Sequence, residues 1–263
     1  MGARATAAIV VALLVAVSAG GCRDAAEQRA ESARAQEWAA LQRDKRTIDG
    51  ERGELRRLRG RLAAVPIAAD GTPLAAGDAA IAREVALREE RLAARSSHLG
   101  DRLVHYLGGF VHDAGGSPPG WNAAVRMKSD EDLAVAQEWI DRGGDYRRAI
   151  EILETQRALD PGDERLTQAL VRAREMRFVT PERFARVQAG MSPIDVRAAL
   201  GPVNLREVLR RPAEQLEAWY YPKRGGGKAA VYFRYEEGRR GYVVYQTDLA
   251  AGTSRPGPPA QVS

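Results

Sequence analysis

The chain contains one cysteine, Cys22, among its 263 residues. A single cysteine excludes a disulfide within the chain, so packing and hydrogen bonds have to stabilise the fold. The chain also lacks a Gly-x-Ser-x-Gly nucleophile turn, a glycine-rich phosphate loop and paired cysteines for a metal ion. These absences predict a protein that is not an enzyme and that uses neither a cofactor nor a metal ion.

Histidine is also scarce, and the three histidines, His98, His105 and His112, are spaced seven residues apart. Seven residues of helix rise about 10 Å, which is too far for two imidazoles to share one metal ion. Asp101 lies between the first two, where it can pair with a protonated histidine. The spacing favours solvated or interfacial histidines and leaves a pH-sensitive contact as an alternative.

The one long apolar run lies at the start of the chain. Arg4 precedes it, Ala7 to Val17 form it, and small residues from Ser18 to Gly21 follow it. This order is typical of a secretory signal peptide, and the run is shorter than the roughly 20 residues that a membrane-spanning helix needs. We therefore expect residues 1–21 to be an export signal.

The segment from Ala19 to Cys22 resembles the bacterial lipobox, although Ala19 stands where leucine is usual. The resemblance implies cleavage before Cys22 and attachment of diacylglycerol to its sulfur, and two or three acyl chains anchor a protein stably. Arg23 replaces the aspartate that retains many lipoproteins at the inner membrane, which implies the outer membrane, while Asp24 leaves inner-membrane sorting open. The alternative is an ordinary signal peptide with an incidental thiol.

Composition limits the partners of the remaining chain. Apolar residues make up 44% of the sequence and charged residues 29%, which suits a body that buries a core outside the membrane. The net charge of +5 favours anionic lipid headgroups, lipopolysaccharide phosphates or acidic proteins as partners. Nucleic acid is not an expected partner of an exported protein.

Two long helices are predicted within residues 22–114. The first covers Ala25 to Ala64, and its apolar residues recur every seven positions, at Leu41, Ile48, Leu55 and Leu62. Basic residues occupy the partner positions, at Lys45, Arg52 and Arg59, which favours a helix docked on its own chain over a two-stranded coiled coil. Pro66 to Gly77 break the helix.

The second helix is predicted to begin with Asp78 as its cap. Its apolar stripe consists of Ile81, Val85, Leu92, Leu99, Leu103 and Leu107. The two helices are therefore expected to form an antiparallel hairpin. Gly115 to Gly120 contain no residue suited to a helix or strand interior, and we predict a linker over residues 115–128.

Three shorter helices are predicted over residues 129–178. Ser129 is expected to cap the first, with Asp132 as its capping partner, and Gly143-Gly144 end it. The second covers Tyr146 to Leu159 and stops at Pro161-Gly162, and Asp163 caps the third.

Residues 143–166 resemble the second half of a tetratricopeptide repeat (TPR) and the start of the next. Gly144 matches the tight turn, Ala149 the small residue where the helices approach, and Pro161 the end of the unit. The resemblance implies a repeat groove at Tyr146, Ala149 and Leu153, with Leu153 and Leu159 in the core. An unrelated helical hairpin is the alternative.

Residues 179–249 are predicted to form an α+β domain. Thr180-Pro181 and Ser192-Pro193 each begin a short helix, and Gly201-Pro202 end the second. Four strands in an antiparallel meander are expected at residues 203–209, 216–221, 230–235 and 241–247. Residues 250–263 are small, polar and rich in proline and glycine, and we expect them to be disordered.

The helical half of this domain resembles the BamE (SmpA/OmlA) lipoproteins. The matching residues are Phe184, Val187, Gly190, Met191, Ser192, Asp195, Val196, Leu200 and Gly201. Aromatic segments around Trp219 and Val231 resemble the strands of that family, whereas Pro202 comes one place early and the following linker is longer and basic. The resemblance implies a small ααββββ fold with an antiparallel sheet and a role in outer-membrane assembly.

A basic cluster interleaved with aromatic residues marks the same domain. The basic residues are Arg206, Arg210, Arg211, Lys223, Arg224, Lys228, Arg239 and Arg240. One interpretation is a sheet edge that charge protects from aggregation. The other is a lipid- or partner-binding surface beside the anchor, formed by Arg206, Arg210, Arg211, Lys223, Arg224, Trp219 and Tyr220.

The sequence therefore predicts an α+β lipoprotein with a long helical hairpin, TPR-like helices and a BamE-like domain. Such a protein would face the periplasm from the outer membrane and act as a non-enzymatic accessory or scaffold in outer-membrane protein assembly or envelope integrity, with the β-barrel assembly machinery among its protein partners. The alternative is a TPR-type adaptor lipoprotein for secretion or polysaccharide export.

Overall fold

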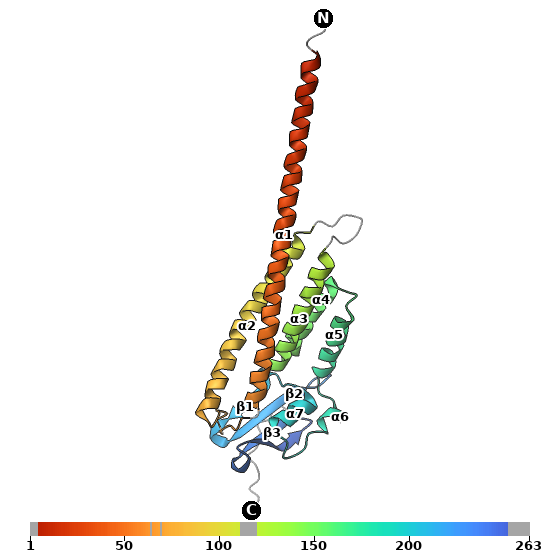
Figure 1. The fold of residues 1–263 in the computed structure, drawn as a ribbon. Coiled ribbons are helices and arrows are strands. Elements are labelled where there is room, and N and C mark those ends of the chain that lie inside the picture. The colour runs from red at the N-terminus through yellow and green to blue at the C-terminus, as the bar shows by residue number, and fades with distance from the viewer. Residues whose placement is uncertain (1–4, 64, 69, 111–119, 252–263) are drawn as a thin grey trace, which may run out of the picture.

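A computed structural model describes residues 5–63, 65–68, 70–110 and 120–251, with side chains from Ala25 onward (Figure 1). The helices are α1 (Ala5–Ala63), α2 (Ala76–Gly108), α3 (Trp121–Gly143), α4 (Tyr146–Leu159), α5 (Glu164–Met176), α6 (Pro181–Phe184) and α7 (Pro193–Leu200). The strands are β1 (Val208–Arg211), β2 (Leu216–Pro222), β3 (Lys228–Glu236) and β4 (Gly241–Asp248). The α+β class predicted from the sequence is confirmed.

Helices α1 and α2 form the expected antiparallel hairpin (Figure 1). Leu41, Ile48 and Leu55 of α1 are buried against the apolar stripe of α2, so both predicted stripes are confirmed. The predicted Asp78 cap is wrong. Helix α2 begins at Ala76, two residues earlier, and the carboxylate of Asp78 lies in the first turn, where it faces the positive end of the helix dipole.

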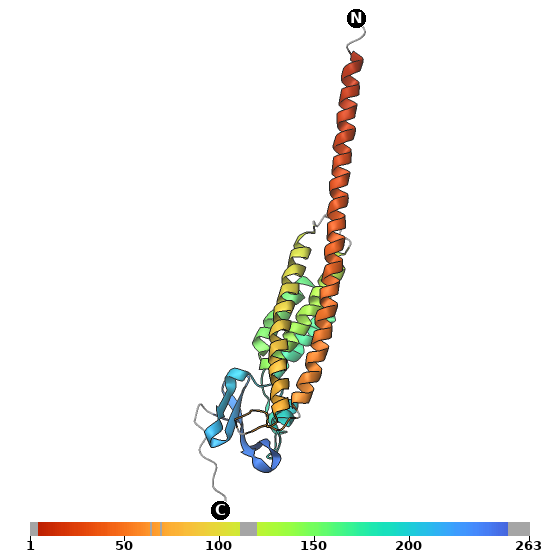
Figure 2. The same cartoon turned by 60° about the vertical axis from the view of Figure 1, so that its left-hand side comes forward.

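Helix α1 is longer than the sequence predicted and continues through the expected signal segment. Every residue from Ala25 to Gln36 is exposed, and Leu41 is the first buried residue. Arg34 donates to the carbonyl of Gly109, the residue that follows α2, at 3.2 Å. The earlier part of α1 therefore projects beyond the other helices, as both views show (Figures 1 and 2).

No helix among the described residues is long and apolar enough to cross a membrane.

Helix α3 corrects two predictions. It begins at Trp121, so residues 121–128 are helical and not part of a linker, while residues 115–119 of the predicted linker lie outside the described residues. Ser129 is not a cap but a fully buried residue inside α3, where its hydroxyl accepts a hydrogen bond of 2.9 Å from Nε2 of Gln156. The residue that suits a cap thus links α3 to α4 instead. Asp132 likewise pairs with Lys128.

Helices α4 and α5 lie where the sequence placed them. Asp145 and Asp163 cap them, each accepting a hydrogen bond from a backbone N–H of the first turn. The prediction that Leu159 fills the core is wrong, because its side chain is 43% exposed. Leu166 and Leu170 of α5 close the core of these helices instead.

The sheet has the order β1-β2-β3-β4 with antiparallel neighbours, which confirms the predicted meander. Helices α6 and α7 cover one face, and a capping box between Ser192 and Asp195 starts α7. The predicted first strand is placed too early. Asn204 caps a 3₁₀ turn at Leu205–Glu207 by accepting from the backbone N–H of Arg206, so β1 begins only at Val208.

The helical part and the sheet domain pack together at two glycines. Gly144 ends α3 with φ of +57°, and a Cβ there would lie 2.3 Å from the carbonyl oxygen of Val203. Gly201 has φ of +87°, and a Cβ there would lie 2.6 Å from the hydroxyl of Tyr146. Both positions require a residue without a side chain.

The end of the described chain corrects the predicted disordered tail in part. Ala251 is buried and packs against Ala230 and Tyr232 on the sheet face that the helices leave open. Residues 252–263 lie outside the described residues.

Candidate functional site

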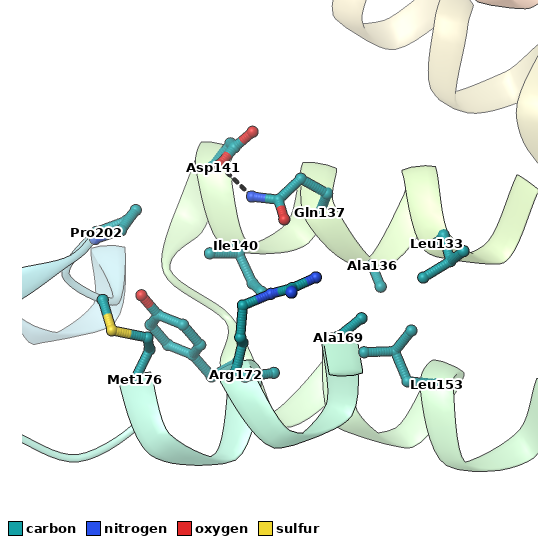
Figure 3. A pocket seen from close by; sticks show the side chains of 12 residues that line it. Leu133, Ala136, Gln137, Ile140, Asp141, Leu153, Ala169, Arg172, Met176 and Pro202 are labelled. Carbon is teal, nitrogen blue, oxygen red and sulfur yellow. Dashed lines mark hydrogen bonds between the residues drawn. The ribbon is translucent and has the colours of Figure 1, made fainter. Parts of the chain in front are cut away.

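A groove of 230 Å³ lies between α3 and α5, with α4 beneath it (Figure 3). Its lining is mostly apolar and consists of Leu133, Ala136, Gln137, Ile140, Asp141, Tyr146, Leu153, Ala169, Arg172, Ala173, Met176 and Pro202. Residues of α3 and α5 contribute at spacings of three and four, so one face of each helix forms a wall.

The predicted repeat-groove residues all lie on α4, but only two of them reach this groove. Tyr146 and Leu153 line it, whereas Ala149 is fully buried behind them and lets the helices approach. Burial raises the pKa of Tyr146 to about 12, and the charge of Arg183 limits the rise. The phenol is therefore neutral at physiological pH.

Polar residues that the sequence analysis missed stand at the rim of the groove. Nε2 of Gln137 donates to Oδ1 of Asp141 at 2.7 Å, and Arg172 lies across from them on α5 (Figure 3). Arg172 is exposed and has no carboxylate partner in the part of the chain that the structure describes. The groove can therefore accept an apolar side chain and, beside it, a carboxylate.

The predicted basic surface of the last domain is not one surface. Trp219 is 3% exposed and lies in the core between the helices and the sheet, with the guanidinium of Arg197 5.3 Å from the ring centre, so its assignment to a binding surface is wrong. Alternation along β2 is the reason, because neighbouring side chains point to opposite faces of a sheet. Tyr220 accordingly points to the open face.

Several of the predicted basic residues already have acceptors. Nε of Arg210 lies 3.1 Å from a carboxylate oxygen of Glu217, and Nη1 of Arg211 lies 3.1 Å from one of Glu214. Lys223 donates to a backbone carbonyl, that of Leu249, at 3.0 Å. The two arginine pairs support the interpretation of a charge-protected sheet edge for β1.

A hollow of 670 Å³ on the open sheet face brings other predicted residues together. Arg206, Tyr220 and Lys228 line it, with Leu209 and Ala251 between them. Lys228 pairs with Glu207 and lies over the ring of Tyr220 at 5.9 Å. Arg206 and Arg224 have no ion-pair partner among the described residues, and only Arg206 lines the hollow.

The histidines form no visible site. His98 and His105 are exposed on α2, and His112 lies outside the described residues. No group of three histidine, cysteine, aspartate or glutamate side chains in the described residues could hold a metal ion.

The basic hollow and Cys22 lie at opposite ends of the molecule. The helix from Cys22 to Ala63 rises about 60 Å. The loop after Ala63 contacts the sheet domain, since the N–H of Ile67 donates to the carbonyl of Arg240 at 3.2 Å. Both views show the amino-terminal part of α1 and the sheet at opposite ends of the molecule (Figures 1 and 2). The sequence predicted that this surface lies beside the anchor at Cys22, and the structure places it at the other end of the molecule.

The chain matches no protein-family model, no curated protein and no solved structure. The TPR and BamE resemblances stay predictions, and function has to be inferred from the geometry of the chain itself.

Proposed function

We propose that this is an outer-membrane lipoprotein without catalytic activity, anchored at Cys22, whose α1 holds the sheet domain about 60 Å from the membrane, toward the periplasm. The observation that carries the proposal is the position of Cys22 and the sheet domain at opposite ends of the helical body. Residues 25–33 support it, because this stretch of helix is exposed on all sides and contains no apolar residue larger than alanine. Such a helix suits a spacer between two bodies.

The proposed role of the sheet domain is that of an accessory or scaffold in outer-membrane protein assembly or envelope integrity. Its BamE-like sequence favours the β-barrel assembly machinery as a partner. The hollow of Arg206, Tyr220 and Lys228 is the surface best suited to that contact. It combines a concave shape, an aromatic ring and Arg206, a cation that has no ion-pair partner within the part of the chain that the structure describes.

The same geometry favours an acidic protein over the anchoring membrane as the partner of this hollow. Charge attraction to a lipid surface fades within a screening length of about 8 Å at physiological salt. Arg206 near the far end of a spacer of about 60 Å is well outside that range. Binding of anionic liposomes by the free domain would therefore not describe its contact in the cell.

The anchor is tested by intact-mass analysis of the protein extracted from envelopes. We expect a chain that begins at Cys22 and carries the mass of diacylglycerol and a further acyl chain. We expect the Cys22→Ala variant to be absent from the membrane-bound mature protein. Ser32→Ala, on the exposed stretch of α1, is the matched control and should behave as the unchanged protein. A mature chain with a free thiol at Cys22 would refute the proposal.

The partner surface is tested by a photo-crosslinking amino acid at position 220, with position 194 as the control. Tyr220 borders the hollow, whereas Ile194 is 54% exposed on α7, at the helix-covered side of the domain. We expect crosslinks to a component of β-barrel assembly from position 220 and not from 194. Equal yields from both positions would contradict a role for the hollow.

A second candidate function is that of a helical adaptor for secretion or polysaccharide export. The groove between α3 and α5 favours it, because Arg172 stands at this apolar groove without a carboxylate partner among the described residues. A photo-crosslinker at Gln137 distinguishes the two functions, since an adaptor would be crosslinked there to an export component. Loss of that product on Arg172→Glu would support the adaptor.

A further inference from the structure

A cleft of 300 Å³ lies where the helical part meets the sheet domain. Its walls come from four segments that are distant in the sequence: the start of α4, the end of α5, the 3₁₀ turn before β1 and the end of β2. The close approach of Gly144 to Val203 holds the first and the third of these segments together. The volume is at the lower end of the range that is typical of small-molecule sites.

One wall of the cleft contains a buried hydrogen-bond donor that has no acceptor. Tyr146 lines the cleft and is 7% exposed, and its hydroxyl has no hydrogen-bond partner among the described residues. The hydroxyl lies beside Gly201, where an added Cβ would be 2.6 Å from it. Tyr221, which lines the same cleft, donates to the carbonyl of Gly201 at 3.3 Å. Because buried hydroxyls are as a rule hydrogen-bonded, the hydroxyl of Tyr146 favours a ligand that brings an acceptor.

Arginines from three of the four segments line the cleft. They are Arg147 of α4, Arg177 at the end of α5 and Arg206 of the 3₁₀ turn. Arg177 and Arg206 have no carboxylate partner in the part of the chain that the structure describes, and Nε of Arg147 is 3.9 Å from a carboxylate oxygen of Glu151. The guanidinium of Arg177 lies 5.0 Å from the ring centre of Phe178, a contact that leaves its N–H donors free.

A fourth arginine lies next to the buried hydroxyl. Arg183 is half-buried, and its guanidinium donates to the backbone carbonyls of Phe178 and Leu200. It has no carboxylate partner within the described residues. Its Nη2 would lie 3.8 Å from the same added Cβ on Gly201 that approaches the hydroxyl of Tyr146. The positive charge of Arg183 is therefore close to Tyr146 and is not balanced by a paired carboxylate.

The carboxylates at the cleft are engaged elsewhere. Oδ1 of Asp145 accepts from the backbone N–H of Arg148 at 3.0 Å and caps α4, and Glu207 pairs with Lys228. Asp141, whose charge also acts on Tyr146, accepts from Gln137 in the groove of Figure 3.

Helix α4 begins at the cleft, and the amino-terminal end of a helix favours an anion. The cations of the cleft outnumber its two carboxylates, one of which already has a cation as its partner. The cleft therefore combines a surplus of positive charge with a hydroxyl donor that is free in the described part of the chain.

We propose that this cleft binds a phosphate group, with the guanidinium groups of Arg177 and Arg206 on its oxygens and the hydroxyl of Tyr146 donating to one of them. A phosphate monoester carries a charge of about −1.5 to −2 at neutral pH, which suits more than one guanidinium. A single carboxylate would leave one of the two arginines without a partner.

Free phosphate and a sugar phosphate share this chemistry. Met176, Pro202 and Pro222 also line the cleft, and they offer apolar contact to the carbon skeleton of a sugar phosphate. The proposal goes beyond the function proposed above, and it depends neither on acylation of Cys22 nor on a protein partner at the hollow of the sheet.

Isothermal titration calorimetry tests the class of ligand. The full chain, purified in a non-ionic detergent, is titrated with glucose 1-phosphate, inorganic phosphate, glucuronate and glucose, each against a detergent blank. We expect glucose 1-phosphate to bind with a Kd of about 1 mM or lower, and at least about fivefold more tightly than glucuronate, which carries a single negative charge. Glucose should give no heat of binding. Weaker binding of inorganic phosphate supports a sugar phosphate as the ligand, and equal binding supports free phosphate.

Three variants locate the binding site. Arg177→Gln and Tyr146→Phe should each weaken glucose 1-phosphate at least about fivefold, because each removes a donor to the phosphate. Arg224→Gln is the matched control and should change the affinity less than about twofold. It removes the same charge from an arginine that also has no ion-pair partner in the described residues but lies outside the cleft. Arg206 is not substituted, because it lines the hollow of the sheet as well.

Thermal unfolding shows whether the variants are folded. Tyr146→Phe keeps the buried ring and removes only the hydroxyl, so its melting temperature should match that of the unchanged protein. Absence of binding by both phosphates, tighter binding of glucuronate, full affinity in Tyr146→Phe or an equal loss in Arg224→Gln would each overturn the proposal. Failure of the Cys22 tests would leave these results unaffected, so the two proposals can fail separately.

Discussion

Arg52 of α1 and Glu131 of α3 form a bidentate ion pair in the interior of the helical body, 79 residues apart in the chain. Nη2 of Arg52 lies 2.5 Å from Oε1 of Glu131, and Nη1 lies 2.9 Å from Oε2. The side chains of both residues are almost fully buried. Ser96 of α2 accepts from Nη2 of Arg52 at 3.0 Å and donates to Glu131, so one polar cluster joins three helices.

Removal of one partner of this pair should strongly destabilise the fold. Arg52→Ala removes the bidentate partner of the buried Glu131 carboxylate and leaves only Lys45, whose Nζ lies 3.6 Å away, as a counter-charge. We expect the free energy of unfolding to fall by about 3 kcal/mol. Urea denaturation measures this loss. Arg88→Ala is the control, because Arg88 pairs with Glu54 at the surface and should cost less than about 1 kcal/mol.

The double variant Arg52→Met with Glu131→Leu tests whether each single variant is destabilised by the charge that it leaves buried without its partner. We expect it to be more stable than either single variant, since neither charge of the pair then stays buried alone. Urea denaturation of all four proteins completes the cycle. A double variant less stable than both single variants would contradict this account of the cluster.

Stability should fall in acid in a way that depends on Glu131. Burial by itself raises the pKa of this carboxyl, but the hydrogen bonds and charge of Arg52 outweigh it, so the folded-state pKa is lowered. A lowered folded-state pKa contributes stability above the unfolded pKa, about 4.3, and that contribution is lost as the pH falls through the folded-state pKa. We therefore expect the unchanged protein to lose more stability below about pH 4 than Glu131→Gln does.

Denaturation at fixed pH values between neutrality and acid measures the difference between the two proteins. The comparison isolates Glu131, because Asp163 and Asp195, whose pKa values are lowered by hydrogen bonds, titrate in both. Parallel stability curves for the unchanged protein and Glu131→Gln would show that the carboxylate is not stabilised by folding.

Gly144→Ala should weaken the packing between the helical part and the sheet domain. The substituted residue would have to keep a positive φ and place Cβ against the backbone of Val203, which cannot move as a flexible side chain can. We expect a loss of at least about 2 kcal/mol in urea denaturation. Gly162→Ala, a loop position with no atom within 4 Å of an added Cβ, should be nearly neutral. Equal effects of the two changes would contradict the close approach.

Hydrogen exchange should divide α1 into two parts. Amides of residues 25–33 are expected to exchange fast, because these residues are exposed in the described part of the chain and an isolated helix of this length is marginal in water. Amides from Leu41 to Leu55 should be protected close to the global stability, since these residues form the core with α2. Mass spectrometry of peptic fragments resolves the two stretches. Uniform protection along α1 would indicate that a further contact covers its exposed part.

Local chemistry allowed much of this fold to be predicted. The glycine pair at 143–144, the Pro161-Gly162 stop and the capping box at Ser192 act within one turn of chain, and each ends or begins a helix where expected. The heptad spacing from Leu41 to Leu55 identified the buried face of α1 for the same reason, because helical periodicity alone decides which residues share a face.

The misplaced residues are those whose environment comes from distant parts of the chain. Serine is a common helix cap, but Ser129 is buried inside α3, where its hydroxyl accepts a hydrogen bond from Gln156 of α4. Trp219 and Tyr220 are neighbouring aromatic residues of one strand, and their sequence does not distinguish them. Only the position of α6 and α7 decides which of the two faces the core. Arg52 sits at a position that spacing marks as apolar, yet its guanidinium is buried because Glu131 and Glu138 provide opposite charges from another helix.

The sequence by itself determined the helix and strand boundaries set by glycine, proline and capping residues, the faces that periodicity selects, and a sole sulfur at the end of an apolar leader. Only the tertiary structure decided that Arg206 and Tyr220 share a hollow, that Cys22 lies at the opposite end from it, and that Tyr146 and Arg177 line one cleft. The physical reason is range: caps and turns depend on neighbours along the chain, whereas a surface or a buried charge depends on which helices and strands meet in space.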